Sequence, residues 1–298
     1  MKRIAKQNLV HAYGPDNPTR LTVEPGEAFV VETHDRFAGW QGSAEAPDLA
    51  APALLGVTGA VAVSGARPGD VLAVDVLGID LVGGFGQVNA IPGKGAFAGL
   101  VERFQTRRVP ITPEGVPFGG ATIPLRPMIG RIGTAPADRS VPSVAPGPHG
   151  GNLDVREVTT GSTIYLPVYL PGGLLSAGDV HAAMGDGESL ISGVEAQANL
   201  TLRCRVLDRD LAARIGLQHP MVQTPDAFLT VASAPTLDEA ARVALETLRR
   251  LLVTLKGLEP IEAAMLISVA ADVGVAQIVN PLVTAKVSID RRIFQIEA

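Results

Sequence analysis

Acidic residues and one histidine gather in a short stretch of the sequence, from Asp179 to Glu195. Asp179 and His181 are two residues apart, so on an extended chain their side chains point to the same side, about 7 Å apart. Asp186 and Glu188 repeat this spacing, and Glu195 follows them. Carboxylate oxygens and an imidazole nitrogen that converge in this way can bind one divalent cation, with zinc favoured over manganese or iron.

The alternative for this stretch is a solvated acidic loop. It accounts readily for Asp186 and Glu188, which stand among glycines. It accounts less well for His181, which lies between Val180 and Ala182. Each unpaired charge that is buried costs several kcal/mol, so four carboxylates beside a histidine need compensation if they are buried. The local pattern alone leaves both interpretations open.

A second polar run begins at His149 and continues through Gly150, Gly151 and Asn152. Two adjacent glycines let a ligand or an ion approach the backbone closely. The Asn152 side chain offers both a donor and an acceptor, which suits an amide substrate or an oxyanion. The alternative is a glycine-rich turn in which Asn152 satisfies its own backbone.

Asp35 follows a histidine at the end of an apolar segment near the amino terminus. In a β-sandwich, strand ends from distant segments gather at one rim. We therefore expect Asp35 to join His149, Asp179, His181 and Glu195 in one cleft, within roughly 8 Å of the His181 ring, as an ion ligand or as the partner that orients one. The alternative is an exposed Asp35 that caps a turn.

Other catalytic patterns are weak. The glycine-rich segment 83–86 is not followed by a helical pattern, which argues against a dinucleotide-binding loop. No Gly-x-Ser-x-Gly motif of a serine hydrolase occurs. The single cysteine, Cys204, lies between Arg203 and Arg205, and strand alternation puts the two arginines on the opposite face. This predicts a buried structural thiol rather than a nucleophile.

The bulk composition restricts the partners. The 298 residues carry a net charge of -5, which gives no attraction to nucleic acid or to an acidic membrane surface. No run of about 18 apolar residues occurs, so no membrane-spanning segment is expected. A single cysteine forms no internal disulfide and suits a reducing compartment, so we expect a cytoplasmic protein.

The elements that must position these residues are mostly short strands. The 33 glycines and 23 prolines punctuate β-like runs, which predicts a sandwich or distorted barrel. We expect a hairpin over 20–33, paired strands at 61–63 and 71–79, a loop over 83–99 and a short strand near 128–132. Further strands are expected at 162–168, 198–206, 275–279 and 285–289. Few aromatic residues predict an aliphatic core.

The helices are expected late in the chain. Thr236 with Glu239 forms a capping box, an apolar stripe at helical spacing follows through residue 255, and Gly257 suits the end. Pro260 suits the first turn of a second helix that reaches about Ala271. The expected fold class is mainly β with α, a β-sandwich-like body with a late helical excursion, in a single domain over residues 1–298.

At these residues the chain resembles the acetamidase/formamidase family. The resemblance runs through segments 29–35, 66–72, 128–136, 148–193 and 280–282 and covers nearly the whole chain. It implies a β-sandwich-type body, a homo-oligomer, with a dimer expected, and hydrolysis of formamide- or acetamide-like amides to a carboxylate and ammonia. The positions that match the polar residues of the family's motifs are Asp35, His149, Asn152, Asp179, His181, Asp186, Glu188 and Glu195.

The resemblance also implies a bound divalent metal, for which zinc is expected and Ca²⁺ or Mn²⁺ are alternatives. The expected metal ligands are Asp35, His149, Asp179 and His181. Glu188 or Glu195 is expected to take a proton from water and return one to the leaving nitrogen. Asn152 or the Gly150-Gly151 backbone is expected to steady the oxyanion.

The chain departs from the family pattern at one stretch. Where the family usually has Asn-Pro-x-Thr-Gly-Pro, this sequence has Leu55-Gly56-Val57-Thr58-Gly59-Ala60. His34 and Trp40 also differ from the common pattern, and Trp40 is expected to line the substrate pocket. An altered acyl group follows if this stretch forms the pocket. Two alternatives stay open: a non-catalytic protein that binds a small ligand, and a hydrolase of cyclic amides or carbamates.

Overall fold

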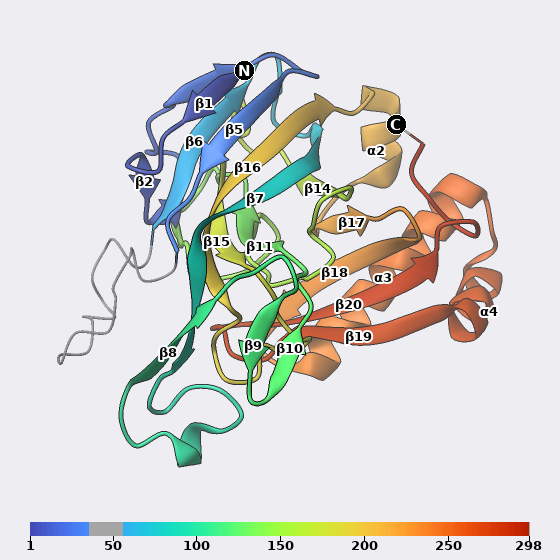
Figure 1. Cartoon of the computed structure of the whole chain (residues 1–298). Helices are drawn as coiled ribbons and strands as arrows, with labels where there is room; N and C mark the ends of the chain where they lie inside the picture. The colour runs from blue at the N-terminus through green and yellow to red at the C-terminus, as the bar shows by residue number, and fades with distance from the viewer. Residues whose placement is uncertain (36–55, 298) are drawn as a thin grey trace.

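The computed structural model describes residues 1–35 and 56–297, and β-structure dominates in them (Figure 1). Sixteen strands join in one sheet, and two short two-stranded sheets lie beside it. The amino-terminal strands lie at one end of the molecule, and the helices lie with the last strands at the other. The structure thus confirms the predicted class, which is mainly β with a late helical part.

The elements have the following bounds. The strands of the first half are β1 (Lys2–Ile4), β2 (Leu9–Val10), β3 (Ala12–Tyr13), β4 (Leu21–Val23), β5 (Ala28–Glu32), β6 (Val57–Val63), β7 (Val71–Ala90), β8 (Gln105–Pro110), β9 (Val116–Phe118), β10 (Ala121–Ile123), β11 (Met128–Gly133) and β12 (Val141–Pro142). Those of the second half are β13 (Gly150–Asn152), β14 (Thr163–Pro167), β15 (Leu175–His181), β16 (Glu195–Val206), β17 (Met221–Gln223), β18 (Ala227–Ala234), β19 (Ala271–Gln277) and β20 (Val283–Asp290). The helices are the short 3-10 helix η1 (Ala98–Leu100), α2 (Arg209–Ile215), α3 (Leu237–Lys256) and α4 (Pro260–Ala270).

The centre of the sheet is formed by β15, β16 and β7. The main path of hydrogen-bonded strands runs β13-β11-β15-β16-β7-β14-β17-β18-β20-β19. Strand β16 pairs antiparallel with β15, β5 and β7. The β15–β16 ladder ends where His181 lies directly opposite Glu195. Sheet pairing therefore brings the two ends of the acidic stretch together.

The core is aliphatic, as the low aromatic content predicts. Among the described residues, the largest cluster of buried side chains consists of Val, Leu, Ile, Ala and Cys with Phe29 as its single aromatic ring. A second cluster lies under the helices, where Leu248, Leu251 and Leu252 of α3 are buried. Full burial of a leucine side chain stabilises a fold by about 1.5–3 kcal/mol. Packing of this face fixes α3 to the sheet.

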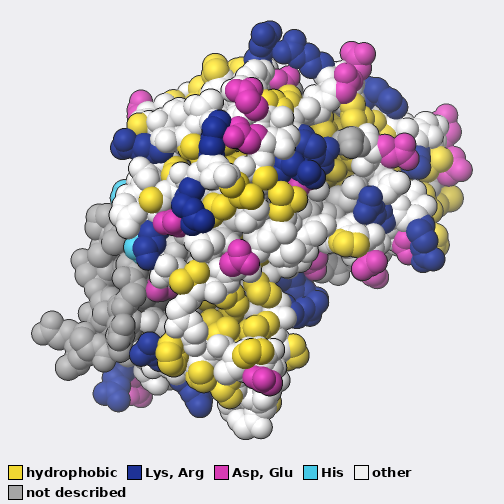
Figure 2. Space-filling model, turned by 45° about the horizontal axis from the view of Figure 1, so that its top comes forward, with side chains coloured by type: hydrophobic (Ala, Val, Ile, Leu, Met, Phe, Trp, Pro, Cys, Tyr) yellow, Lys and Arg dark blue, Asp and Glu magenta, His cyan; other side chains and the backbone are white. Residues whose placement is uncertain are grey.

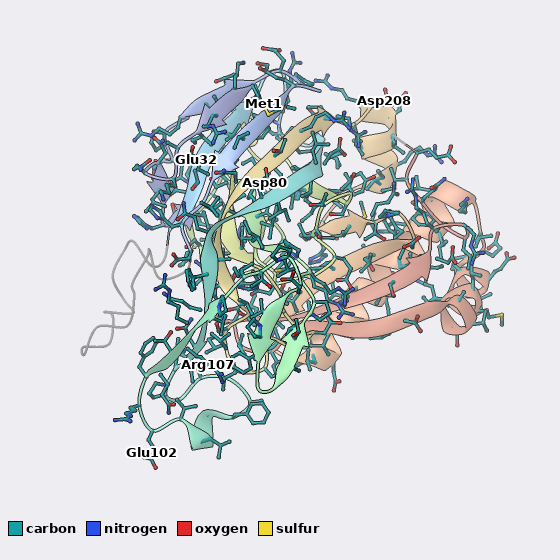
Figure 3. The ribbon with its side chains drawn as sticks, viewed as in Figure 1. Met1, Glu32, Asp80, Glu102, Arg107 and Asp208 are labelled. Atoms are coloured by element: carbon teal, nitrogen blue, oxygen red, sulfur yellow. The ribbon has the colours of Figure 1, made fainter. Side chains whose placement is uncertain are left out.

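The late helices begin and end as predicted. The Thr236 hydroxyl accepts a hydrogen bond from the Glu239 backbone N–H at 3.3 Å, and Gly257 ends α3 in the left-handed conformation. Pro260 opens α4. The structure adds α2, which the sequence analysis missed; Asp208 caps it and is labelled near it in Figure 3. No helix in residues 1–35 and 56–297 is long and apolar enough to span a membrane.

Two predicted strand pairings are wrong, although the strands themselves form. Strands β4 and β5 flank the turn at Pro25-Gly26, yet β4 pairs with β6, and β5 pairs with β1 and β16. Strands β6 and β7 likewise pair with others rather than with each other. A turn between two strands fixes only that the chain changes direction. Burial against the long strands β15, β16 and β7 decides the partners.

The predicted loop over 83–99 is wrong for its first half, because β7 continues through Ala90. Gly83 and Gly84 have positive φ angles of 90° and 68°, which let the strand change its course without a Cβ clash. Beyond them, residues 85–90 pair with β8. Figure 3 shows Glu102 and Arg107 on this excursion, at the end of the molecule away from α2.

Asp75 joins three strands through its carboxylate. It accepts hydrogen bonds from Arg203 and Arg205 of β16 at 2.9–3.0 Å and from the Thr163 hydroxyl of β14 at 2.8 Å. Burial alone would raise the pKa of Asp75, but the Arg205, Thr163 and Arg203 donors hold it below its ordinary value. Cys204, between the two arginines, is fully buried in the core, as predicted.

We predict that Asp75→Asn lowers the free energy of unfolding by about 1.5–3 kcal/mol at pH 7, because two guanidinium groups lose a charged acceptor. The folded-state pKa is depressed, so the stabilisation is present above the unfolded pKa of about 3.9 and is lost as the pH falls through the folded pKa. The difference from wild type should therefore shrink below about pH 4. Denaturant titrations at several pH values measure it.

The matched control is Asp80→Asn, because Asp80 is on the same strand and is exposed. It should leave the stability unchanged. Equal losses for the two variants, or a loss for Asp75→Asn that persists in acid, would contradict the role assigned to the carboxylate.

Candidate active site

His181 lies at the centre of a buried group of carboxylates. Its ring is fully buried at the end of β15, and its Nε2 lies 3.3 Å from Oε2 of Glu195 and 3.9 Å from Oε1 of Glu188. Antiparallel pairing of β15 with β16 places Glu195 opposite His181. The loop between these strands returns Glu188 to the same ring.

Two further carboxylates complete the cluster: Asp179, two residues before His181, and Asp154, two residues after Asn152. Ligand atoms of Asp154, His181 and Glu188 lie within 4.8 Å of one another, and so do those of Asp179, His181 and Glu195. All five side chains are buried. We call them the carboxylate–histidine cluster. The prediction that Asp179 and His181 converge, with Glu188 and Glu195 beside them, agrees with this geometry.

The donor set of the cluster fits a divalent cation. Four carboxylates are buried together, and Oδ1 of Asp154 has no hydrogen-bond partner among the described residues. Burial and the neighbouring Asp179 raise the pKa of Asp154 to about 6. Burial, followed by Asp154, raises the pKa of Glu188 well above its ordinary value. Each carboxylate thus destabilises the charge of the others, and a bound cation would relieve that repulsion.

Glu195 and the other carboxylates act on His181 in the opposite direction. Burial alone would lower the pKa of the imidazole, but Glu195, Asp179 and Glu188 raise it well above its ordinary value. The surrounding carboxylates therefore favour a positive charge on this ring. Oxygen donors with one imidazole nitrogen are a ligand set that zinc accepts, and harder cations accept the oxygens.

Three of the cluster's residues have an uncommon backbone conformation. Asp154, Asp179 and Glu188 have positive φ angles of 48°, 58° and 46°. Residues other than glycine rarely adopt this region, at a cost on the order of 1–3 kcal/mol each, and such residues concentrate at functional sites. Their side chains all turn into the same buried space. The backbone strain is therefore part of how the cluster is assembled.

Arg131 and Asn280 position the carboxylates. Arg131 Nε lies 3.1 Å from Oδ2 of Asp179 and donates to Oδ1 of Asn152 at 3.1 Å. Nδ2 of Asn280 donates to Oδ2 of Asp154 at 2.7 Å. Asn152 in turn donates to Oδ1 of Asn280 at 2.9 Å. Both polar atoms of the Asn152 side chain are thus engaged, which favours a positioning role over the predicted oxyanion contact.

His149 lies outside the carboxylate–histidine cluster. Its ring packs against Tyr13, with the ring centroids 5.0 Å apart. Burial, with a smaller effect of Arg139, lowers the pKa of His149 to about 4, so the ring is neutral at pH 7. Gly150 and Gly151 follow it in β13, which pairs with β11. The metal role of His149 and the substrate role of the two glycines stay predictions.

Asp35 reaches the neighbourhood of the cluster from the amino-terminal strands. It lines a pocket of about 180 Å³ together with Gln87, Arg108 and Glu195. Glu195 thus connects this pocket with His181. The expected distance from Asp35 to the His181 ring stays a prediction. Trp40 and Leu55 lie outside the described residues, while Gly56–Ala60 run into β6, which pairs with β15.

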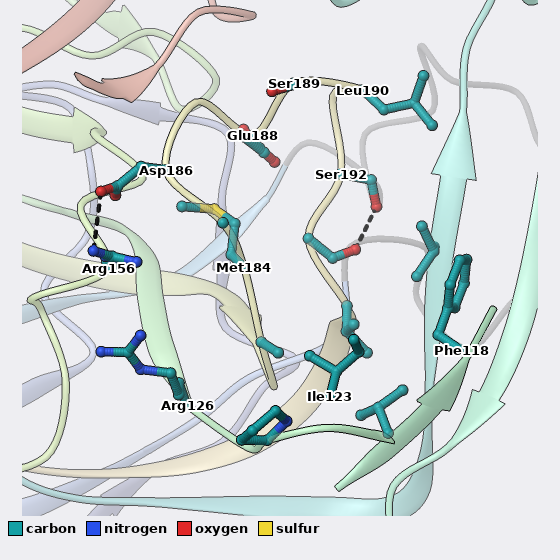
Figure 4. Close-up of a pocket in the computed structure, with 17 residues that line it drawn as sticks. Phe118, Ile123, Arg126, Arg156, Met184, Asp186, Glu188, Ser189, Leu190 and Ser192 are labelled. Carbon is teal, nitrogen blue, oxygen red and sulfur yellow. Dashed lines mark hydrogen bonds and ion pairs between the residues drawn. The ribbon is translucent and has the colours of Figure 1, made fainter. Parts of the chain in front are cut away.

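A larger pocket of about 560 Å³ lies next to the cluster (Figure 4). Glu188 and Gly193 are part of its wall, and Gly193 also packs against the His181 ring. Figure 4 shows the Glu188 carboxylate directed into the space between a charged side, with Arg126 and Arg156, and an apolar side. Glu188 is therefore the carboxylate that belongs to the cluster and lines this pocket.

Sequence reasoning missed Asp154, Arg131 and Asn280. Asp154 is two residues beyond Asn152, the same spacing as between Asp179 and His181, so this signal was available. Nothing local marks Arg131 or Asn280, because their partners are distant in sequence. Asp186 turns away from the cluster and pairs with Lys286 at 2.7 Å and Arg156 at 3.2 Å.

The fold and this site define a β-rich protein with a buried carboxylate–histidine centre, and comparisons with known proteins identify the family. The model of the Acetamidase/Formamidase family matches residues 1–144 and 134–296. The chain belongs to this family.

Solved structures named as acetamidases are similar to this chain over nearly its whole length. The acetamidase from Bacillus halodurans is 38% identical with a TM-score of 0.92, and the alignment covers 98% of each chain. A predicted acetamidase/formamidase from Thermoanaerobacter tengcongensis is 32% identical with a TM-score of 0.91, covering 98% of this chain and 96% of that one. The formamidase of Methylophilus methylotrophus is 27% identical over 272 residues, 70% of this chain and 66% of that protein. The chain thus spans about two thirds of the length of this curated relative.

We predict that Gly193→Ala weakens divalent-cation binding by about tenfold or more, because a Cβ there would lie 2.7 Å from Cγ of His181. A ligand displaced by about 0.5 Å no longer meets the geometry of a site. Isothermal titration of the metal-free protein with Zn²⁺ measures the effect. Gly185→Ala is the control, since nothing lies within 4 Å of its Cβ position. Wild-type affinity in Gly193→Ala would contradict the close packing described above.

Proposed function

We propose that this protein hydrolyses carboxamides to a carboxylate and ammonia at the carboxylate–histidine cluster, with a divalent cation bound there. Membership of the acetamidase/formamidase family supports the reaction class. The single observation that carries the proposal is the position of Glu188, which lies 3.9 Å from His181 and also lines the large pocket. Buried ligands and a substrate space meet at this one side chain.

The cation would be held by His181, Asp179 and Glu195, whose ligand atoms lie within 4.8 Å of one another, and by Asp154, whose ligand atom lies within 4.8 Å of those of His181 and Glu188. Zinc is the expected ion, and Ca²⁺ or Mn²⁺ are the alternatives because so many of the ligands are carboxylates. Such an ion supplies a Lewis acid that polarises an amide carbonyl.

In this proposal Glu188 transfers a proton from the attacking water to the leaving nitrogen. It takes a proton from the attacking water as the C–O bond forms, and it gives a proton to the nitrogen as the C–N bond breaks. The reaction consumes one water and yields one carboxylate and one ammonium ion, because the proton of the new carboxylic acid passes to ammonia. An amide nitrogen is a poor leaving group, so the acid step is needed as much as the base step. Glu195, which lies closer to His181, is the alternative base.

We predict that Glu188→Gln lowers kcat by about 10²–10⁴-fold, which is the usual contribution of general acid–base catalysis. Ammonia release from a panel of linear amides, cyclic amides and carbamates measures it. The control is Glu102→Gln, because Glu102 is exposed and belongs neither to the cluster nor to the lining of the large pocket; Figure 3 shows it near the tip of the segment before β8. Full activity in Glu188→Gln would contradict its role.

The same panel separates the alternatives. Turnover only of cyclic amides or carbamates would favour those substrates, and no turnover at all would favour a non-catalytic ligand-binding protein. His181→Ala should lose metal and activity together, since His181 is common to both ligand groups. Asp186→Ala should keep the metal, because Asp186 pairs with Lys286 instead. Elemental analysis that finds no stoichiometric metal in active protein would remove the cation from the proposal.

We further propose a homodimer in the cytoplasm. Helix α4 buries Ala263 and Ile267 on one face but leaves Ile261, Met265 and Val269 largely exposed on the other. These three residues follow one another at four-residue spacing, so they form one apolar stripe. An exposed apolar stripe of this kind suits a contact with a second copy of the chain. The buried, uncrosslinked Cys204 suits a reducing compartment.

We predict that Val269→Asp shifts the protein from dimer to monomer, because a charge would be buried at the most exposed position of the apolar stripe. Light scattering after size exclusion measures the mass. Val269 is 84% exposed and Leu100 on η1 is 78% exposed, so Leu100→Asp is the matched control. A dimer in both variants would exclude the α4 stripe as the interface.

A further inference from the structure

The large pocket beside Glu188 has a predominantly apolar wall. Its apolar residues come from four segments of the chain. They are Val88 of β7; Val116 and Phe118 of β9; Ile123, the last residue of β10, with Pro124 after it; and Ala183, Met184, Leu190 and Val194 between β15 and β16. Figure 2 shows hydrophobic side chains gathered over the part of the molecule that carries β9 and β10. An apolar cavity of about 560 Å³ is within the range that takes ligands of many heavy atoms.

The charged side of the pocket is largely compensated within the protein. Arg156 pairs with Asp186 at 3.2 Å, and Asp186 is shared with Lys286. Arg126 is exposed at the rim. Glu188 is the carboxylate that connects the pocket with the carboxylate–histidine cluster. A ligand in the pocket would therefore meet apolar side chains along its length and the reacting groups at one end.

We propose that this pocket holds the acyl group of the substrate, so that the preferred substrates are primary amides of large apolar acids, with an aromatic or branched body. This inference rests on the proposed function and names its substrate class. Formamide has no carbon beyond its carbonyl and acetamide has one methyl group, so neither fills the apolar wall. Each further methylene that is buried in the transition state raises kcat/KM by about fourfold.

A larger acyl group does not change the reaction itself. For an amide R–CO–NH₂, the water oxygen bonds to the carbonyl carbon and the C–N bond breaks, giving R–COO⁻ and NH₄⁺. The pocket acts on R alone. Its contribution is selectivity among acyl groups, because apolar surface of the substrate leaves water as the reacting carbonyl approaches Glu188.

The first experiment compares formamide, acetamide, butyramide and phenylacetamide as substrates of the metal-loaded protein, by ammonia release. The expected result is a kcat/KM that rises along this series, with phenylacetamide at least about 100-fold above acetamide. A kcat/KM that is flat or falls along the series overturns the inference and leaves the proposed function standing. No turnover of any amide overturns both.

The second experiment assigns the selectivity to this pocket. Ile123→Ala removes an apolar side chain from its wall and should lower the ratio of kcat/KM for phenylacetamide over acetamide by about tenfold, mainly through KM. The control is Ile293→Ala, because Ile293 is 37% exposed and Ile123 is 39% exposed, and Ile293 does not line the pocket. The control should keep the wild-type ratio. An unchanged ratio in Ile123→Ala, or equal changes in both variants, places the acyl group elsewhere.

Discussion

The burial of four carboxylates around one imidazole is the constraint on which the site depends. Asp154, Asp179, Glu188 and Glu195 are all buried within reach of His181. Mutual repulsion and the loss of water cost several kcal/mol per unpaired charge. Compensation from the protein includes the Arg131 contact with Asp179, the Asn280 contact with Asp154, the Ser192 hydroxyl that donates to Glu195 at 3.1 Å, and the imidazole itself. A cation bound as proposed would supply further compensation, because the ligand atoms lie within 4.8 Å of one another in each of the two groups.

Both strand pairing and an unusual backbone conformation bring the residues of this cluster together. The β15–β16 ladder sets His181 against Glu195, and the isolated bridge of Gly187 with Gln277 holds the loop that returns Glu188. Positive φ angles then turn three of the carboxylates inward. Asn280 joins from the last segment before β20, with its backbone N–H held by the Gln277 side chain. The unusual backbone conformations at the cluster cost free energy, and the extensive sheet and the aliphatic core offset this cost.

Glu188 lies between the carboxylate–histidine cluster and the large pocket. On one side of this residue lie the buried ligands, and on the other lies the apolar pocket formed largely by the β9–β10 hairpin and the loop 183–194. The hairpin forms a small sheet of its own, outside the sixteen-stranded sheet. Changes in its side chains can therefore alter the wall of the proposed acyl pocket without changing the β15–β16 ladder that holds the cluster.

The sequence by itself determined the features that depend on neighbouring residues. Thr236, Gly257 and Pro260 predicted the late helices, and alternation predicted a buried Cys204. The expected nearness of Asp179 and His181 holds, but through a left-handed backbone at Asp179 rather than through the extended chain from which it was predicted. Only the tertiary structure decided which strands pair, why residues 85–90 continue β7, and that Asp154, Arg131 and Asn280 belong to the site. The reason is physical: caps and alternation are set within a few residues, whereas strand partners and buried ion pairs are chosen by the burial of groups more than 20 residues apart in the chain.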